Sequence, residues 1–217
     1  MHNSIDNLNI IENILKSKIK NIKIPSIIAV SKSFPMSEIL PLINHGHINF
    51  GENKVQESLE KWSSIKEDFE HIKLHMIGKL QTNKVKYVIP LFDYIHSLDT
   101  LKLAEKISNE QIKKNKKLKI FIQINIGNES QKSGILIDQL ENFYKKCTND
   151  LGLSIVGLMC LPPKNSNMSN YFPTMKKLSN KINLSDLSMG MSNDFLDAAK
   201  NGATYLRIGT KIFGNRN

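Results

Sequence analysis

The sequence predicts a single α/β domain over residues 1–217, a (β/α)8 barrel of the TIM type with one extra helix at its N-terminus. Short runs rich in isoleucine, leucine and valine recur eight times, helical patterns separate nearly all of them, and the runs are apolar almost throughout. Unbroken apolar strands are typical of a parallel sheet that helices cover on both faces. An open doubly wound sheet shows the same alternation, so the periodicity alone leaves both arrangements open.

The expected elements follow one another with short connections. An amphipathic helix over residues 5–19 comes first. The expected strands are 27–31, 47–50, 73–77, 94–97, 119–126, 154–159, 186–189 and 204–208. The expected helices between them are 37–45, 53–65, a long one that begins at residue 99, 137–147, 170–182 and 192–201.

Capping residues mark several helix ends. Ser37 is a predicted N-cap, because a serine oxygen accepts hydrogen bonds from the free backbone N–H groups of a first turn, and Ser192 stands where the helix over residues 192–201 would begin. Gly46 and Gly202 are expected just after a last turn, where the chain often adopts a left-handed conformation.

The composition is that of a globular protein with an excess of lysine. The formal net charge is +10, yet only Arg207 and Arg216 among the thirty basic residues are arginine. Sites that grip phosphates and bases favour arginine. We therefore interpret the lysines, which are densest over residues 113–119, as solvated surface charges; a nucleic-acid-binding protein is the weaker alternative.

Other features favour a cytoplasmic protein. The N-terminus lacks a secretory signal pattern, and no apolar run approaches the ~18 residues of a membrane span. Cys147 and Cys160 match no metal or redox spacing, so we expect reduced thiols. His45 and His47 lie before the second strand, at the end of the barrel that serves stability, and we expect no metal there.

Polar residues and glycines collect where the strands end, the side of such barrels that carries the site. Gly190 and Gly209 allow close backbone approach, and Ser192 and Thr210 offer hydroxyl donors. The loops after strands seven and eight are the usual phosphate position in this fold. The sequence therefore predicts an anion site there, the alternative being ordinary turn glycines and a helix cap.

Three further residues are candidates for chemistry. Lys32 directly follows the first apolar strand, where partial desolvation would lower its pKa and leave a neutral amine to condense with an aldehyde; the alternative is one more solvated lysine. Arg207 lies in the last strand and needs an acceptor, either a pyridine nitrogen or a buried carboxylate. His75 either approaches a ligand or is a hydrogen-bonded interior histidine.

Taken together, the motifs resemble the pyridoxal phosphate homeostasis protein family, whose fold is similar to the N-terminal barrel of alanine racemase. The matching segments, in family order, are AVSK at 29–32, FGENKVQE at 50–57, HMIG at 75–78, QTNK at 81–84, HSLD at 96–99, QIN at 123–125, KSG at 132–134, GLM at 157–159, LSMGMSND at 187–194, RIGT at 207–210 and IFG at 212–214. The chain departs from the usual pattern at Phe34, where many members carry a second lysine, so we expect no transfer route through such a lysine.

The resemblance implies a site for pyridoxal 5′-phosphate, with the cofactor held as an aldimine on Lys32. It assigns the remaining cofactor-binding roles as follows: Asn53 beside the cofactor, Ser192, Gly209 and Thr210 at its phosphate, and Arg207 at its pyridine nitrogen. A guanidinium cannot protonate that nitrogen, so the ring would be a weaker electron sink than one that faces a carboxylic acid.

The resemblance also implies a role in storing or delivering the cofactor inside the cell, without catalytic residues. We expect a monomer whose partners are the cofactor and apo pyridoxal enzymes, and neither nucleic acid nor membrane. The alternative is an amino-acid racemase, which needs a second base opposite Lys32. In racemases a tyrosine from an additional β-domain supplies it, and this chain ends soon after the eighth strand, with no motif-supported replacement among its five tyrosines.

Overall fold

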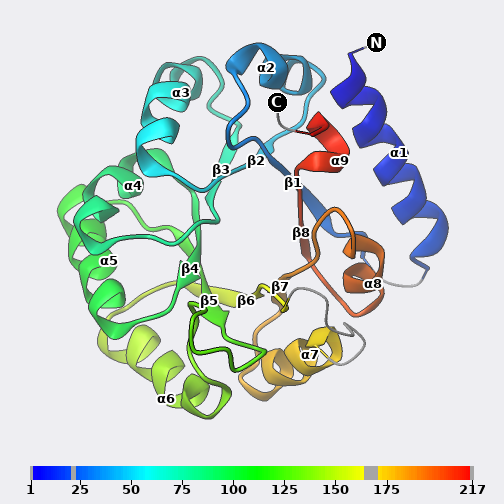
Figure 1. The fold of residues 1–217 in the computed structure, drawn as a ribbon. Helices are drawn as coiled ribbons and strands as arrows, with labels where there is room; N and C mark the ends of the chain where they lie inside the picture. The colour runs from blue at the N-terminus through cyan, green and yellow to red at the C-terminus, as the bar shows by residue number, and fades with distance from the viewer. Residues whose placement is uncertain (1, 21–22, 164–170, 216–217) are drawn as a thin grey trace.

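The computed structural model describes residues 2–20, 23–163 and 171–215. Eight parallel strands form a closed barrel in the order of the sequence, surrounded by helices (Figure 1). The strands are β1 Ser26–Val30, β2 Asn49–Glu52, β3 Lys73–Met76, β4 Tyr94–Leu98, β5 Lys119–Ile124, β6 Ile155–Cys160, β7 Asp186–Ser188 and β8 Tyr205–Ile208. All eight overlap the predicted strands.

The pairing of β1 with β8 decides between the two predicted architectures. Ser26 pairs with Tyr205 and Ala29 with Ile208, so the first strand lies against the last one. An open doubly wound sheet would leave two edges instead. The (β/α)8 barrel is therefore confirmed, and its closure removes every exposed strand edge.

The α-helices occupy the segments between the strands and the two ends of the chain. They are α1 Asn3–Lys18, α2 Met36–Asn44, α3 Val55–Asp68, α4 Val85–Leu91, α5 Leu101–Lys114, α6 Leu140–Lys145, α7 Tyr171–Lys181, α8 Phe195–Lys200 and α9 Thr210–Phe213. The sequence analysis predicted neither α4 nor α9. Pro90 lies inside α4, and α9 is a single turn, so neither carries a clear helical pattern.

The predicted helix ends are partly wrong. Helix α2 begins at Met36 with Pro35 as N-cap, so Ser37 is already helical. Helix α8 begins at Phe195 with Asp194 as N-cap, and Ser192 lies in the loop before it. Gly46 and Gly202 have φ of +94° and +86° directly after α2 and α8, as expected. The predicted start of the helix at Asn170 lies outside the described residues.

Helix α1 completes the ring of helices on the outside of the barrel, beside α2, α8 and α9 (Figure 1). It buries Leu8, Ile11 and Leu15 at a helical spacing. The Asn7 side-chain amide donates to the Ile212 carbonyl at 3.0 Å and ties α1 to α9. The extra N-terminal helix is thus confirmed. Within the described ranges, none of the helices has the length and apolar character that crossing a membrane requires.

Candidate functional site

The neighbouring strands β8, β1 and β2 carry or lead into three of the predicted residues near their carboxyl ends. Strand β1 pairs with β8 on one side and with β2 on the other. Lys32 follows β1, Asn53 follows β2, and Arg207 is the third residue of β8. Since parallel strands end at the same rim of the barrel, these residues share one mouth.

The loops after β7 and β8 join the same mouth. Gly209 lies against the end of β1, where an added Cβ would be 3.3 Å from the Val30 carbonyl oxygen. The Lys211 backbone N–H donates to Ser192 Oγ at 3.3 Å, which holds the two loops together and places Ser192 near Thr210. All six predicted cofactor-binding residues therefore come from segments that meet at this mouth, and Ser192 is not the ordinary helix cap of its alternative interpretation.

Arg207 is buried and makes hydrogen bonds to neutral groups. Its exposed fraction is 4%, and its two terminal nitrogens donate to Ser188 Oγ at 2.7 Å and to the Cys160 carbonyl at 2.8 Å. Burial lowers the pKa of this guanidinium, whereas Cys160 and Asp194 act in the opposite direction. Among the described residues Arg207 forms no ion pair, so the buried-ion-pair alternative is not what the structure shows.

Several buried side-chain oxygens have no hydrogen-bond partner among the described residues. Two of them are neutral groups after or near strand ends, Asn53 Oδ1 after β2 and Ser97 Oγ near the end of β4; the others are the carboxylate oxygens Glu52 Oε2, Glu129 Oε2 and Asp194 Oδ2. A buried polar atom without a partner costs free energy, so such atoms in a binding site commonly await a ligand or water. Orphaned polar atoms, a glycine beside β1 and a buried cation together suit an anionic, polar cofactor such as pyridoxal 5′-phosphate.

An ionic cluster on the outer side of β1 and β2 holds the turn that carries Lys32. Buried Glu52 accepts from Ser31 Oγ at 2.8 Å, from Trp62 Nε1 at 3.0 Å and from Lys61 Nζ at 3.0 Å. Lys61 also donates to the Ser31 carbonyl and to Glu57 Oε1, both at 3.0 Å. The sequence analysis assigned no role to these residues. The sequence could have indicated a structural role for Glu52. Side chains alternate along a strand, so Glu52 faces away from the mouth if Asn53 faces it, and a carboxylate buried there needs donors.

Glu57 reaches the other side of Lys32. Its Oε1 accepts from the Ser33 backbone N–H at 2.6 Å, and Ser33 has a φ of +67°, in the left-handed region. Burial raises the pKa of Glu57, but the Ser33 N–H and the Lys61 ammonium together keep it below its usual value. A charged Glu57 therefore stabilises a turn that a non-glycine residue adopts only at a cost.

A column of polar side chains fills the barrel interior below the mouth. His75 Nδ1 lies 3.0 Å from His96 Nε2, and His75 Nε2 lies 3.1 Å from Asn49 Oδ1. His96 Nδ1 lies 2.8 Å from Ser188 Oγ, which Arg207 also contacts. The structure therefore supports the second interpretation of His75, a hydrogen-bonded interior histidine. The sequence analysis missed the parts that His96 and Asn49 have in this column.

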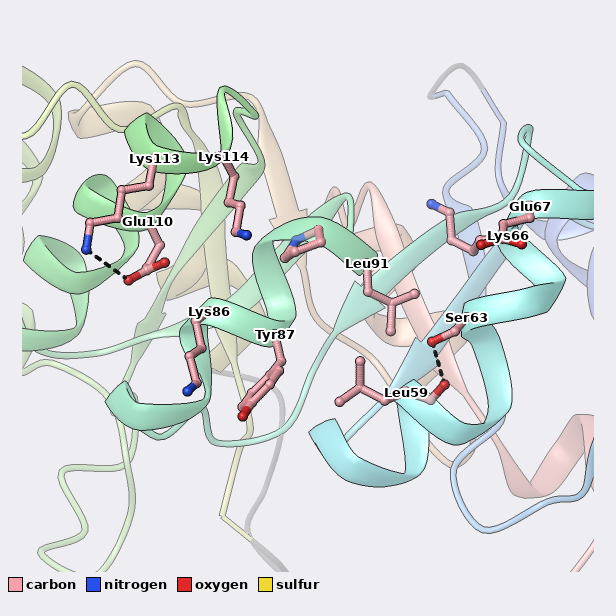
Figure 2. A pocket seen from close by; sticks show the side chains of 11 residues that line it. Leu59, Ser63, Lys66, Glu67, Lys86, Tyr87, Leu91, Glu110, Lys113 and Lys114 are labelled. Carbon is pink, nitrogen blue, oxygen red and sulfur yellow. Dashed lines mark hydrogen bonds and ion pairs between the residues drawn. The ribbon is translucent and has the colours of Figure 1, made fainter.

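An open groove lies on the outside of the barrel, away from these residues (Figure 2). It has a volume of about 820 Å³ and runs over α4 between α3 and α5. Tyr87 and Leu91 of α4 face Leu59 of α3, and Lys113 and Lys114 stand on the α5 side. None of the six predicted cofactor-binding residues lines it, so it is distinct from the mouth of the barrel.

Other expectations concern cysteine and histidine. Cys147 and Cys160 are both free and buried, and burial raises the pKa of each thiol to about 12. The His47 ring makes a hydrogen bond to the Asn49 carbonyl at 2.9 Å. Within the part of the chain that the structure describes, no group of three or more histidine, cysteine, aspartate or glutamate side chains is arranged to hold a metal ion.

Comparisons with known proteins agree with this geometry. Residues 5–217 match the family described as alanine racemase, N-terminal domain. The pyridoxal phosphate homeostasis protein of Haemophilus influenzae is 36% identical over 225 residues, which cover 97% of this chain and 95% of that protein. The protein of the same name from Escherichia coli K12 is 34% identical over 200 residues, covering 88% and 86%.

Solved structures extend the comparison to three dimensions. PipY of Synechococcus elongatus PCC7942 without PLP has a TM-score of 0.87 and 29% identity, covering 96% of this chain and 99% of that one. The same protein with PLP bound has a TM-score of 0.83, covering 97% and 100%. Alanine racemase from Clostridium difficile, at 16% identity and a TM-score of 0.74, shares the fold alone. The family match over nearly the whole chain and the close curated relatives show that this chain belongs to the pyridoxal phosphate homeostasis protein family.

Proposed function

We propose that this chain binds pyridoxal 5′-phosphate covalently through Lys32 and acts as a non-catalytic holder of the cofactor inside the cell. The observation that carries the proposal is that Lys32 follows β1 and Arg207 lies on β8, the neighbouring strand, so that both belong to one mouth. The binding of PLP by PipY, a relative with the same barrel, supports the choice of cofactor.

Each predicted residue has a place in this arrangement. Lys32 would hold the cofactor, because its amine can condense with an aldehyde and release water. Ser192, Gly209 and Thr210 supply hydroxyl and backbone donors to the phosphate, and Asn53 lies beside the ring. Arg207 faces the pyridine nitrogen as a donor. We further propose that residues 1–217 act as one monomeric domain in the cytoplasm.

The arrangement favours a holder over an enzyme. The bound cofactor supplies an electron sink, and Arg207 keeps that sink weak because a guanidinium does not protonate the pyridine nitrogen. Racemisation also needs a second base at the mouth. Tyr94 and Tyr205 are the first residues of β4 and β8, so both lie at the opposite end of the barrel, with their hydroxyls 3.4 Å apart. Tyr87 lines the outer groove.

Trapping with borohydride tests the lysine. Reduction of the loaded protein is expected to leave a stable adduct on Lys32, identified by peptide mass spectrometry, and Lys32→Ala is expected to abolish both the adduct and the absorption band of the bound cofactor. The matched control is Lys54→Ala, which removes an exposed lysine just after Asn53. An adduct on another lysine in the wild type, or an unchanged band in Lys32→Ala, would contradict the assignment.

A second experiment separates holder from enzyme. Exchange of the α-proton of alanine into deuterated water is expected to proceed no faster with the loaded protein than with free pyridoxal 5′-phosphate. Addition of an apo pyridoxal enzyme is expected to remove the cofactor from the protein at a rate that depends on the concentration of the apoenzyme. Exchange accelerated by the protein and lost in Lys32→Ala would favour the racemase alternative.

A further inference from the structure

The polar column inside the barrel links the opposite end of the barrel to the cofactor-facing arginine. It begins at Asn49, the first residue of β2, and passes through His75 of β3 and His96 of β4. It then crosses to Ser188, the last residue of β7, and ends at Arg207 of β8. His75, His96 and Ser188 are fully buried, so no solvent reaches these contacts.

The hydrogen bonds of the column run in one direction, with each group donating to the next from Arg207 to Asn49. A guanidinium can only donate, so Arg207 donates to Ser188 Oγ. The Ser188 hydroxyl hydrogen then needs an acceptor, and His96 Nδ1 at 2.8 Å provides one. With its Nδ1 accepting, neutral His96 carries its proton on Nε2 and donates to His75 Nδ1, and His75 in turn donates from Nε2 to Asn49 Oδ1. The reverse arrangement would leave the buried Ser188 hydroxyl hydrogen without an acceptor in this column.

Aromatic contacts hold the two imidazole rings in this register. His75 stacks on Tyr94 with centroids 4.2 Å apart and planes inclined by 13°. His96 stacks on Phe121 at 4.3 Å and 15°. Rotation of either ring would break its stacking together with both of its hydrogen bonds. The rings therefore form a rigid base for the serine above them.

A proton added to either ring would break the column. A proton added to His96 would go to Nδ1 and leave the Ser188 hydroxyl hydrogen without its acceptor, and a proton added to His75 Nδ1 would face the Nε2–H of His96. Burial lowers the pKa of His75 to about 3, with the charges of His47 and Lys66 acting in the same direction. Burial also lowers the pKa of His96 well below its usual value, and His75 and Arg207 lower it further.

We propose that His75 and His96 are positioning residues for Arg207: as two neutral rings they orient the Ser188 hydroxyl, which fixes the guanidinium at the mouth of the barrel. This inference rests on the proposed function only in the ligand that Arg207 faces. The column itself is a property of the protein without cofactor. It assigns a role to two histidines that touch no part of the proposed cofactor site.

The first test uses the protein without cofactor. Nitrogen-15 NMR of the histidine rings at pH 7 is expected to show His75 and His96 neutral, each protonated on Nε2 and unprotonated on Nδ1. Assignment uses His75→Phe and His96→Phe, and exposed His45 serves as an internal reference for a solvated ring. A cationic ring, or an Nδ1 proton on either histidine, would overturn the proposed direction of the column. This result does not depend on whether Lys32 binds the cofactor.

The second test measures the consequence for the cofactor. His96→Phe keeps the stacking on Phe121 but removes the acceptor of Ser188, and Ser188→Ala removes the contact with Arg207. Both variants are expected to weaken binding of pyridoxal 5′-phosphate roughly tenfold and to move the nitrogen-15 shift of the labelled pyridine nitrogen away from its wild-type value. Val156→Ala is the packing control: Val156 packs against the same interior cluster but makes neither a hydrogen bond nor a ring contact in the column, so this variant is expected to leave that shift unchanged.

The outcomes separate the two proposals. If the wild type forms no adduct on Lys32, the proposed function fails, and the ring NMR still decides the column. If the wild type binds the cofactor and Ser188→Ala folds with the wild-type affinity and nitrogen shift, the positioning role is overturned. Should His96→Phe fail to fold, Ser188→Ala and the wild-type ring spectrum still give a decision.

Discussion

The two sides of strand β2 carry two buried polar networks of opposite character. On the inner side, Asn49 begins a column of single hydrogen bonds whose members are neutral side chains up to Arg207 at its other end. On the outer side, Glu52 anchors a cluster of charges in which one carboxylate oxygen accepts from three donors. Asn49 and Glu52 lie three positions apart, and because successive side chains point to opposite faces, this odd spacing puts them on opposite faces of the barrel wall.

The difference shows that one strand supports two parts of the candidate site in different ways: Arg207 from the inside of the barrel and the Lys32 turn from the outside. The inner column lies below the mouth where we propose that the cofactor binds, and burial, which lowers the pKa of both histidines, keeps their rings from adding charge next to Arg207. The outer cluster fixes backbone on either side of Lys32, through Ser31 and Ser33, where charge strengthens the hydrogen bonds. We propose that the inner column orients the Arg207 guanidinium, whereas the outer cluster stabilises the turn that carries Lys32.

The largest expected effect comes from breaking the charge balance of the outer cluster. Lys61→Met would leave Glu52, which is fully buried, with only neutral donors, and loss of one partner from a buried ion pair costs roughly 3–5 kcal/mol. We expect the free energy of unfolding in urea to fall by about that amount. The double variant Glu52→Gln with Lys61→Met is expected to recover part of the loss, because no buried charge then remains unpaired. A loss below about 1 kcal/mol in the single variant would show that water compensates Glu52.

Because of His75 in the inner column, we expect the free energy of unfolding to depend on pH. The folded pKa of His75 is lowered from 6.5 to about 3, so between these values the unfolded chain binds a proton that the folded protein does not. Stability from this residue is complete above pH 6.5 and falls with decreasing pH by roughly 1.4 kcal/mol per pH unit. His75→Phe keeps the stacking on Tyr94, and we expect it to reduce the slope of unfolding free energy against pH by that amount between pH 4 and 6. Equal slopes in both proteins would mean that His75 titrates normally.

A smaller effect is expected from the contact that joins the outer cluster to the Lys32 turn. Ser31→Ala removes one hydrogen bond to Glu52, which keeps Lys61 and Trp62 as donors. The expected loss of unfolding free energy is roughly 1 kcal/mol. Because the Ser31 carbonyl still accepts from Lys61, the turn keeps its shape, and the adduct on Lys32 is expected to form as in the wild type. A loss of that adduct would show that the hydroxyl itself places the lysine.

The sequence predicted the strands of the barrel and the position of Lys32 at the end of one of them, but it did not predict the two polar networks inside and outside the barrel wall. Strand periodicity and the position of Lys32 depend on local order along the chain, and both were predicted. Barrel closure through Ser26 and Tyr205 needed the three-dimensional pairing. His96 and Ser188 lie 92 positions apart, and no local pattern connects them. The helix that was expected to begin at Ser192 begins at Phe195, and the Ser192 hydroxyl accepts from Lys211 of the neighbouring loop, a contact that no local pattern indicates.

The smallest expected effect uses the same substitution as the largest one, in a solvated place. Lys16 pairs with Glu12 one helical turn away at 3.6 Å, and the lysine side chain is 61% exposed, against 9% for Lys61. Water and salt already solvate such a pair, so Lys16→Met is expected to change the free energy of unfolding by less than about 0.5 kcal/mol. Both variants replace one lysine by the same apolar side chain, so the difference between their urea midpoints measures what burial adds to the outer cluster. If the two losses were equal, the stability of the Lys32 turn would not depend on the buried charges of Glu52 and Lys61.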